Sequence, residues 1–257
     1  MPSALTLGLL RVWPLPADAA EHGPALDAHL RLNLWIAFLL LLLAHGLLIA
    51  GVLWKKREIR HSDNLLLEYG PLAALVLLFF GLGVRAQMLW ADQRYTGAAP
   101  EAMQVEVTGV QFAWYFRYPG EDETFGATSP DRVAPGEGNP LGIDPKDSHG
   151  VDDFISSQLV LPAGREVDLT LHAQDVIHGF SIPELRLKQN ATPGMTSHIH
   201  FTATQPGDYA ILCTQVCGLG HYRMLSTVRV LPEDQFDTWL VKREQAARAN
   251  AILGGLR

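Results

Sequence analysis

Positive charge and cysteine are both scarce in this sequence. Its 257 residues include 20 Lys and Arg residues against 27 Asp and Glu residues, which gives a formal net charge of −7. Proteins that bind nucleic acid present a basic surface, so this balance argues against a nucleic-acid partner. The two cysteines do not belong to a Cys-x-x-Cys-His motif, so the chain carries no attachment site for a c-type heme.

Long apolar runs are absent from most of the chain and are confined to residues 32–54 and 65–90. A helix needs about 20 apolar residues to cross a bilayer core, so both runs are predicted to span a membrane. The intervening loop, residues 55–64, holds four cations, which is typical of the cytoplasmic side. These cations are Lys55, Lys56, Arg57 and Arg60. We therefore predict a transmembrane hairpin across residues 32–100, with both chain termini outside the cytoplasm and a larger membrane subunit packed against it.

A positively charged start is also missing from residues 1–31. The apolar run Ala4–Leu10 and the small residues around Ala17–Ala19 resemble parts of a signal peptide. The basic segment that normally precedes such a run is absent, however. We therefore expect residues 1–31 to form an exported tail that is not cleaved.

From residue 101 onwards the chain has the pattern of a soluble β domain. Short apolar or alternating runs are separated by Pro and Gly, which predicts a sandwich or barrel. The predicted strands are 103–110, 111–118, 155–161, 166–172, 176–182, 196–202, 207–213 and 225–231. Residues 233–250 predict a helix, because acidic residues occupy its first turn and basic residues follow.

Two features of this β region leave alternatives open. Residues 119–153 are rich in Pro, Gly and Asp and predict a long surface loop, either a partner-binding insertion or, as we favour, a decoration of the fold. Residues 101–257 contain 12 Lys and Arg residues against 20 Asp and Glu residues. This acidity either attracts a basic protein partner or keeps the surface solvated.

The stretch Cys213–Met224 gathers two thiols, an imidazole and a thioether within twelve residues. Ligands of these kinds select copper over hard cations, whereas zinc prefers four Cys or His ligands and has little use for Met. Two cysteines four residues apart suggest two bridging thiolates that hold two copper ions. His178, at the end of an apolar, strand-like run, can supply a further imidazole. Outside the cytosol two cysteines most often form a disulfide, but a disulfide requires neither the following Gly-x-Gly-His nor the Met.

These residues also resemble a known family. The stretch matches Cys-x-x-x-Cys-Gly-x-x-His-x-x-Met, the copper loop of subunit II of the heme-copper cytochrome c oxidases, and residues 175–195 match that family's upstream block. The resemblance implies a cupredoxin-like Greek-key barrel over residues 101–232, a C-terminal helix over 233–257 and a binuclear copper A (CuA) centre. The implied ligands are His178, Cys213, the backbone carbonyl of Gln215, Cys217, His221 and Met224.

The resemblance further implies a function as an electron relay. A cytochrome c-type donor would deliver electrons to the copper centre, and subunit I of a respiratory oxidase would reduce oxygen at its heme-copper site. The expected location is a bacterial plasma membrane, with the copper domain on the periplasmic or extracellular side. No acid–base pair or nucleophile accompanies the copper loop, which agrees with a relay. The alternatives are a membrane-tethered copper-delivery protein and a copper-free quinol oxidase subunit II.

Three positions are interpreted through the family at a finer level. The family's donor-facing Trp aligns with Phe112, and Trp114 matches the next aromatic, so both are expected at the point of electron entry. Many members have Glu where Gln215 stands, and there the Glu helps to bind a magnesium ion at the subunit I interface. Glu68 resembles a carboxylate near the mouth of a proton channel.

Overall fold

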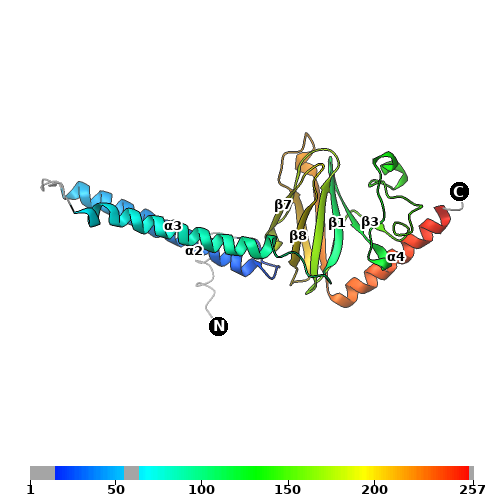
Figure 1. Ribbon diagram of the computed structural model, residues 1–257, viewed down its shortest axis with the longest axis horizontal. Coiled ribbons are helices and arrows are strands. Elements are labelled where there is room, and N and C mark those ends of the chain that lie inside the picture. Colours follow the sequence, from blue (N-terminus) through cyan, green and yellow to red (C-terminus); the bar gives the residue numbers. More distant parts are fainter. Residues whose placement is uncertain (1–14, 55–63, 255–257) are drawn as a thin grey trace. The chain divides into compact units, whose positions relative to one another are not determined.

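The computed structural model describes residues 15–54 and 64–254 of the chain (Figure 1). They form two compact units. One comprises residues 24–96, and the other combines the short segment before residue 24 with everything from residue 97 onwards.

The first unit consists of two long helices, α2 (Gly23–Leu53) and α3 (Leu65–Arg94). Both are long enough and apolar enough to cross a membrane. The helix α2 begins well before residue 32, where the apolar run starts, because Asp27 and Arg31 interrupt the hydropathy pattern without interrupting the helix. The Asn64 side chain caps α3 by accepting a hydrogen bond from the Leu66 N–H. The predicted cytoplasmic cations Lys55, Lys56, Arg57 and Arg60 lie outside the described residues.

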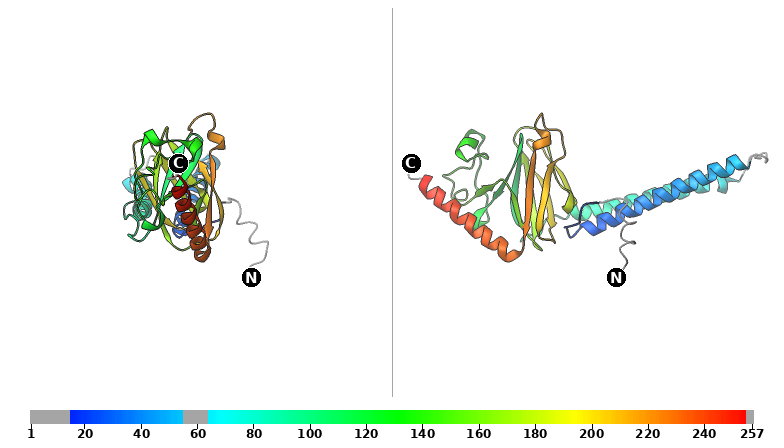
Figure 2. Two further views of the ribbon diagram at one scale, coloured as in Figure 1. Left: turned by 90° about the vertical axis from the view of Figure 1, so that its right-hand side faces the viewer. Right: turned by 180° about the vertical axis from the view of Figure 1, so that it is seen from behind.

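The second unit is a β domain made of two five-stranded sheets (Figure 2). Its strands are β1 (Met103–Val110), β2 (Ala113–Tyr118), β3 (Phe154–Ser156), β4 (Leu159–Pro162), β5 (Glu166–Ala173), β6 (His178–Ile182), β7 (Leu187–Ala191), β8 (Ser197–Thr202), β9 (Gly207–Cys213) and β10 (Leu225–Leu231). The sheet orders are β3-β2-β1-β5-β8 and β4-β10-β9-β6-β7. The predicted combination of a two-helix hairpin, a cupredoxin-like β domain and a C-terminal helix is confirmed, with the β domain built as a sandwich.

Alternation of side chains along the strands builds the core of this sandwich. Successive residues of a strand point to opposite faces, so every second residue can face the other sheet. In β1 the side chains of Val105 and Val107 are fully buried, and in β5 those of Leu169 and Leu171 are. The two strands run parallel as neighbours, so these four apolar side chains form a continuous patch on the inner face.

The predicted strand over residues 155–161 is in fact two strands in different sheets. Its first part is β3, which pairs with β2, and its second part is β4, which pairs with β10. The turn at Ser157 and Gln158 carries the chain from one sheet to the other. The strand β7 escaped the sequence pattern because its middle residues are polar, as is common at the exposed edge of a sheet.

Residues 119–153 form an insertion that lies beside the C-terminal helix α4 (Glu233–Gly254) in both views (Figure 2). Arg248 of the helix and Glu121 of the insertion are joined by an ion pair of 2.6 Å. The ring of Trp239 packs edge-on against Tyr118, with ring centroids 5.3 Å apart. Short 3₁₀ helices occur at η1 (Gly120–Asp122), η2 (Pro130–Arg132), η3 (Pro135–Glu137), η4 (Pro183–Leu185) and η5 (His221–Arg223).

Residues 15–22 are part of the β domain instead of a separate tail. Ala20 forms an antiparallel bridge with Ala203, and the Ala19 N–H donates to the Glu184 carbonyl at 2.9 Å. The side chains of Ala19 and Ala20 are 1% and 3% exposed, so they belong to the core. Of the predicted tail over residues 1–31, the structure describes residues 15–31. Residues 15–22 form a segment docked on the β domain, which we call the docked segment (15–22), and the residues after it form the first turns of α2.

Candidate metal centre

Four chain connections meet at one end of the sandwich, the upper end in Figure 1. They are the β1–β2, β5–β6, β7–β8 and β9–β10 connections. The pairing requires this arrangement, because β1 and β5 run parallel and both end there, while β6 and β8 begin there. The residues that the sequence singles out as metal ligands lie on the β9–β10 connection or at the strand ends beside it and beside the β5–β6 connection, so strands that are distant in the chain bring them together.

The β9–β10 connection folds its four side-chain donors toward one point. The Sγ atoms of Cys213 and Cys217 are 3.8 Å apart. The Cys217 Sγ lies 3.6 Å from the His221 Nδ1 and 3.7 Å from the Met224 Sδ. The carbonyl oxygen of Gln215 is 3.2 Å from the Cys213 Sγ. Five of the predicted ligand groups therefore converge within this one loop.

His178 joins the group from the β5–β6 connection. Its side chain is fully buried, and its ligand atom and the two cysteine sulfurs all lie within 4.8 Å of one another. The Nε2 atom is hydrogen-bonded to the Asp175 Oδ1 at 2.7 Å. The Nδ1 atom is buried and has no hydrogen-bond partner among the described residues. Because the carboxylate takes the Nε2–H, the Nδ1 lone pair is left free to bind a metal.

The donor set fits copper. Two thiols, two imidazoles, a thioether and a carbonyl oxygen are soft or intermediate ligands that suit copper and that calcium or magnesium would not prefer. A buried imidazole nitrogen without a partner is costly, and a bound metal ion removes that cost. All six predicted ligands are thus close together, although they come from positions as far apart as His178 and Met224.

Two ionisable groups at the cluster, Cys217 and Asp175, have shifted pKa values. Burial, followed by the neighbouring Cys213 thiol, raises the pKa of Cys217 to about 11. Metal binding at neutral pH must therefore displace a thiol proton. Burial also acts to raise the pKa of Asp175, but hydrogen bonds from His178 and from the N–H groups of Gln111 and Val176 prevail and lower it. Asp175 is therefore a carboxylate that can orient the imidazole.

The residues predicted for electron entry lie at different depths. Phe112 is 37% exposed and lies over the copper loop, because a Cβ atom added to Gly218 or Gly220 would press into its ring. Trp114 is only 2% exposed, so a donor at the surface does not contact it directly. Its ring packs edge-on against His178, with ring centroids 5.8 Å apart. Glu68 lies in the first turn of α3, in the other unit of the chain.

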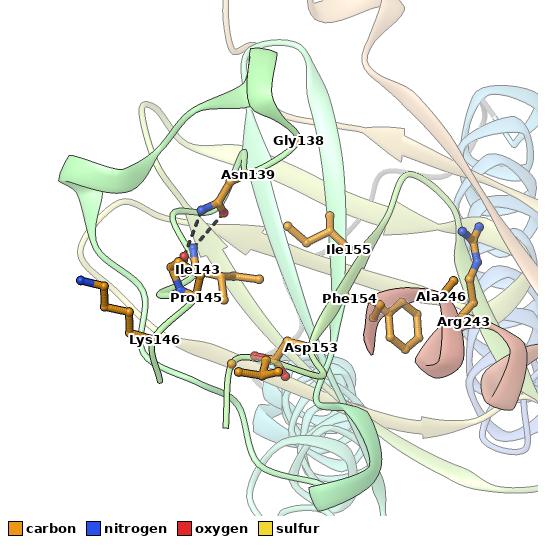
Figure 3. Close-up of a pocket in the computed structure, with 13 residues that line it drawn as sticks. Gly138, Asn139, Ile143, Pro145, Lys146, Asp153, Phe154, Ile155, Arg243 and Ala246 are labelled. Atoms are coloured by element: carbon orange, nitrogen blue, oxygen red, sulfur yellow. Dashed lines mark hydrogen bonds between the residues drawn. The ribbon is translucent and has the colours of Figure 1, made fainter. Parts of the chain in front are cut away.

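A separate hollow of about 690 Å³ lies between the insertion and α4 and involves none of the predicted ligands (Figure 3). Its lining is mixed, with Phe154 and Ile155 on one side and Lys146 at the rim pointing away. The Asn139 side chain is tied to the backbone of Ile143 by two hydrogen bonds of 2.9 and 3.0 Å. These polar contacts shape the insertion and offer no donor set for a metal.

Comparison with known proteins points to one family. Residues 103–231 match the family model described as cytochrome c oxidase subunit II, periplasmic domain. The alternative cytochrome c oxidase subunit 2 of Bradyrhizobium diazoefficiens is 33% identical over 172 residues, which cover 65% of this chain and 61% of that relative. The cytochrome c oxidase subunit 2 of Thermostichus vulcanus is 26% identical over 297 aligned positions, covering 93% of this chain and 81% of that relative.

Among solved structures, the periplasmic domain of subunit II of cytochrome oxidase from Bradyrhizobium japonicum is similar to this chain. It is 24% identical and aligns with a TM-score of 0.42, covering 58% of this chain and 99% of that domain.

Proposed function

The chain belongs to the cytochrome c oxidase subunit II family, and from this premise we propose that it is the electron-relay subunit of a respiratory terminal oxidase. Electrons from a cytochrome c-type donor would enter at the metal end of the β domain and leave toward the heme-copper subunit I, where oxygen is reduced to water. The proposed cofactor is binuclear copper, CuA. Its ligands would be His178, Cys213, the Gln215 carbonyl, Cys217, His221 and Met224.

One observation carries the proposal: two thiol sulfurs 3.8 Å apart, surrounded by imidazole, thioether and carbonyl donors. Two copper ions bound there would supply one-electron chemistry shared across both thiolates. The protein's own contribution is to keep the ligands still. Cys213 is held at the end of β9 and His178 at the start of β6, and these two strands pair directly. A sheet that fixes the ligands limits their movement when the charge of the site changes.

The surface at the metal end suits contact with a protein partner. Three side chains of the copper loop are strongly exposed, namely Val216 at 77%, Leu219 at 98% and Tyr222 at 74%. Apolar side chains gathered at such exposure are typical of interaction sites. The four connections at this end contain one acidic and one basic residue, Asp175 and Arg223, apart from histidines. We assign this surface to the electron donor and to the other oxidase subunits.

The docked segment (15–22) supports the predicted topology. It belongs to the same compact unit as the β domain, whereas the two candidate membrane helices follow it in the chain and precede residue 97. If the chain crosses the membrane twice between the docked segment and residue 97, it returns to the side on which the docked segment lies. With the cationic loop in the cytoplasm, the copper domain and both flanks of the hairpin would lie on the periplasmic or extracellular side.

Copper analysis of the full chain tests the proposal. The protein, purified in detergent, is reduced, reconstituted with copper and examined by elemental analysis and by optical and EPR spectroscopy. We expect two copper ions per chain and a mixed-valence binuclear spectrum. Cys213→Ser and Cys217→Ser should each abolish that spectrum, and His221→Ala should lower the copper content. Met224→Leu should keep both ions with an altered spectrum, because a thioether is a weak ligand.

Matched controls exist at the same end of the domain. Met195 is 59% exposed, and the side chain of His198 is 58% exposed, so Met195→Leu and His198→Ala should leave copper content and spectrum unchanged. A wild-type chain without copper under these conditions would refute the proposal. A copper content that both cysteine variants leave intact would refute the bridging thiolates. Stoichiometric zinc with no EPR signal would identify a different metal site.

A further inference from the structure

The turn between β1 and β2 contains two residues, Gln111 and Phe112, and no predicted metal ligand. It lies at the metal end of the sandwich, between the two connections that carry ligands. Gln111 makes one hydrogen bond to each of those connections, and Phe112 packs against one of them. A residue pair that contacts both ligand-bearing loops is placed to set the distance between them.

The first contact reaches the copper loop. The side-chain amide of Gln111 donates from Nε2 to the backbone carbonyl of Cys217 at 2.5 Å. Cys217 is the residue whose sulfur lies nearest to three other ligand atoms, those of Cys213, His221 and Met224. A hydrogen bond that holds the Cys217 carbonyl therefore also restrains the Cys217 sulfur, around which the other ligand atoms lie.

The second contact reaches the His178 loop. The backbone N–H of Gln111 donates to the Asp175 Oδ2 at 2.7 Å. The other carboxylate oxygen, Oδ1, accepts from the Val176 N–H and is hydrogen-bonded to the His178 Nε2, each at 2.7 Å. A continuous chain of hydrogen bonds thus joins the imidazole of His178 to the backbone of Cys217 through Asp175 and Gln111.

The third contact is the ring of Phe112 on the copper loop. A Cβ atom built on Gly218 would lie 3.1 Å from this ring and 2.8 Å from the Gln111 Nε2. A Cβ atom on Gly220 would overlap the ring more severely. The Gly-x-Gly sequence after Cys217 is therefore needed so that the turn can approach the loop closely.

We propose that Gln111 is a positioning residue for the metal centre, which couples the His178 loop to the Cys213–Met224 loop, and that Phe112 clamps the latter. This inference rests on the proposed function for the identity of the metal but not for the contact itself. The hydrogen bonds around a metal-binding cysteine tune the metal's spectrum and potential. Loss of the Gln111 amide should therefore change the centre without removing any ligand.

Gln111→Met tests the role, because it keeps the length of the side chain and the backbone N–H but removes the amide donor. Gln111→Glu is a second variant, which sets a carboxylate against the Cys217 carbonyl. Gln174→Met is the matched control. The Gln174 side chain also donates to a backbone carbonyl at this end, that of Pro140 at 3.1 Å, but Pro140 belongs to no ligand loop. Circular dichroism of each detergent-purified full chain verifies the fold.

The first readout needs no metal. In the reduced, copper-free chain, the rate at which a maleimide labels Cys217, followed by mass spectrometry, reports how tightly the loop is closed. Cys217 is 4% exposed in the folded chain. We expect Gln111→Met to speed this labelling about fivefold, the effect of one ordinary hydrogen bond. Phe112→Ala should act in the same direction, whereas Gln174→Met should match the wild type.

The second readout is the EPR spectrum and midpoint potential of the copper-loaded chain. Gln111→Met should shift both, Gln111→Glu should shift them further or lose copper, and Gln174→Met should shift neither. Unchanged labelling of Cys217 in Gln111→Met would overturn the positioning role, whatever metal the site holds. An unchanged spectrum and potential in a chain that binds two copper ions would overturn it as well. If the wild-type chain binds no copper but Gln111→Met still accelerates the labelling of Cys217, the proposed function is refuted and the positioning role of Gln111 is not.

Discussion

Replacing Arg117 with methionine should unfold the β domain more easily without disturbing the metal centre. The Arg117 side chain is 2% exposed and holds the insertion to the sheet. Its guanidinium donates to the Gly126 carbonyl at 2.5 Å and to the Glu106 carboxylate at 2.9 Å, and it pairs with Asp153 at close range. Methionine keeps much of the buried volume but removes every one of these donors.

The magnitude follows from the partners left behind. Removing one member of a buried ion pair typically costs about 3–5 kcal/mol, because the other charge stays buried without compensation. The Asp153 side chain is fully buried, and its Oδ1 has no hydrogen-bond partner among the described residues even with Arg117 present. For a domain of this size the cost corresponds to a fall in melting temperature of roughly 6–20 °C.

The loss should also depend on pH. Burial raises the pKa of Asp153 despite the hydrogen bond from Gly126 and the charge of Arg117. A carboxyl whose pKa is higher in the folded state stabilises the fold below its unfolded pKa of about 3.9, and that stability is lost as the pH rises through the folded value. Without Arg117 the folded pKa rises further. The deficit of Arg117→Met should therefore be smaller at pH 5 than at pH 7.

Thermal unfolding of the copper-free chain in detergent, followed by near-ultraviolet circular dichroism at both pH values, measures this deficit. The double variant Arg117→Met, Asp153→Asn should recover part of the stability, because no charge is then left buried. A deficit below about 0.5 kcal/mol at pH 7 would contradict the account, since surface substitutions have effects of that size. An equal deficit at both pH values would show that Asp153 is not the group responsible.

Three further predictions concern the docked segment (15–22), the topology and the donor surface. Ala20→Asp would bury a charge against Ala203 and should release the segment to proteolysis, whereas Glu21→Gln, at an exposed position, should not. Gly136, an exposed glycine with no neighbour near its Cβ position, can be replaced by Cys in a chain without Cys213 and Cys217. An impermeant maleimide should then label it only from the periplasmic side, and labelling only from the cytoplasm would reverse the topology. Leu219→Ser should lower kcat/KM for the electron donor at every ionic strength, because it removes an apolar contact. The double variant Asp131→Asn, Glu137→Gln should lower kcat/KM only at low ionic strength, because salt screens the attraction between charges. If the effect of the double variant did not depend on salt, electrostatic steering of the donor by the insertion would be excluded.

The proposed metal ligands could be selected from the sequence because their chemistry is concentrated there. Five of the six proposed ligand groups lie within residues 213–224, and the histidine and methionine that follow the two cysteines favour a metal over a disulfide. His178 lies far upstream, but the strand-like run that it ends and the match of residues 175–195 to the family's upstream block gave a usable signal. The structure adds the role of Asp175, which holds the imidazole through Nε2.

The supporting contacts were not predictable in this way. The hydrogen bond from Gln111 to Cys217 joins residues 106 positions apart, and a single Gln beside an aromatic run carries no signal of its own. The docked segment (15–22) pairs with Ala203 through its backbone, which any sequence provides. The strand β7 owes its conformation to pairing with β6, since its own residues Lys188, Gln189 and Asn190 are polar. Tertiary pairing decided each of these cases.

The distribution of charge bears on how a donor would reach this centre. The insertion carries nine acidic residues against two basic ones, while the connections at the metal end are nearly free of charge. Through the contact between Gln174 and Pro140, the insertion lies beside the end of β5, next to the Asp175–His178 loop. Charged groups mainly accelerate encounter, whereas close apolar contact brings the redox groups within range of one another. The insertion, for which the sequence favoured decoration, would therefore attract a basic donor toward the proposed contact surface around Leu219.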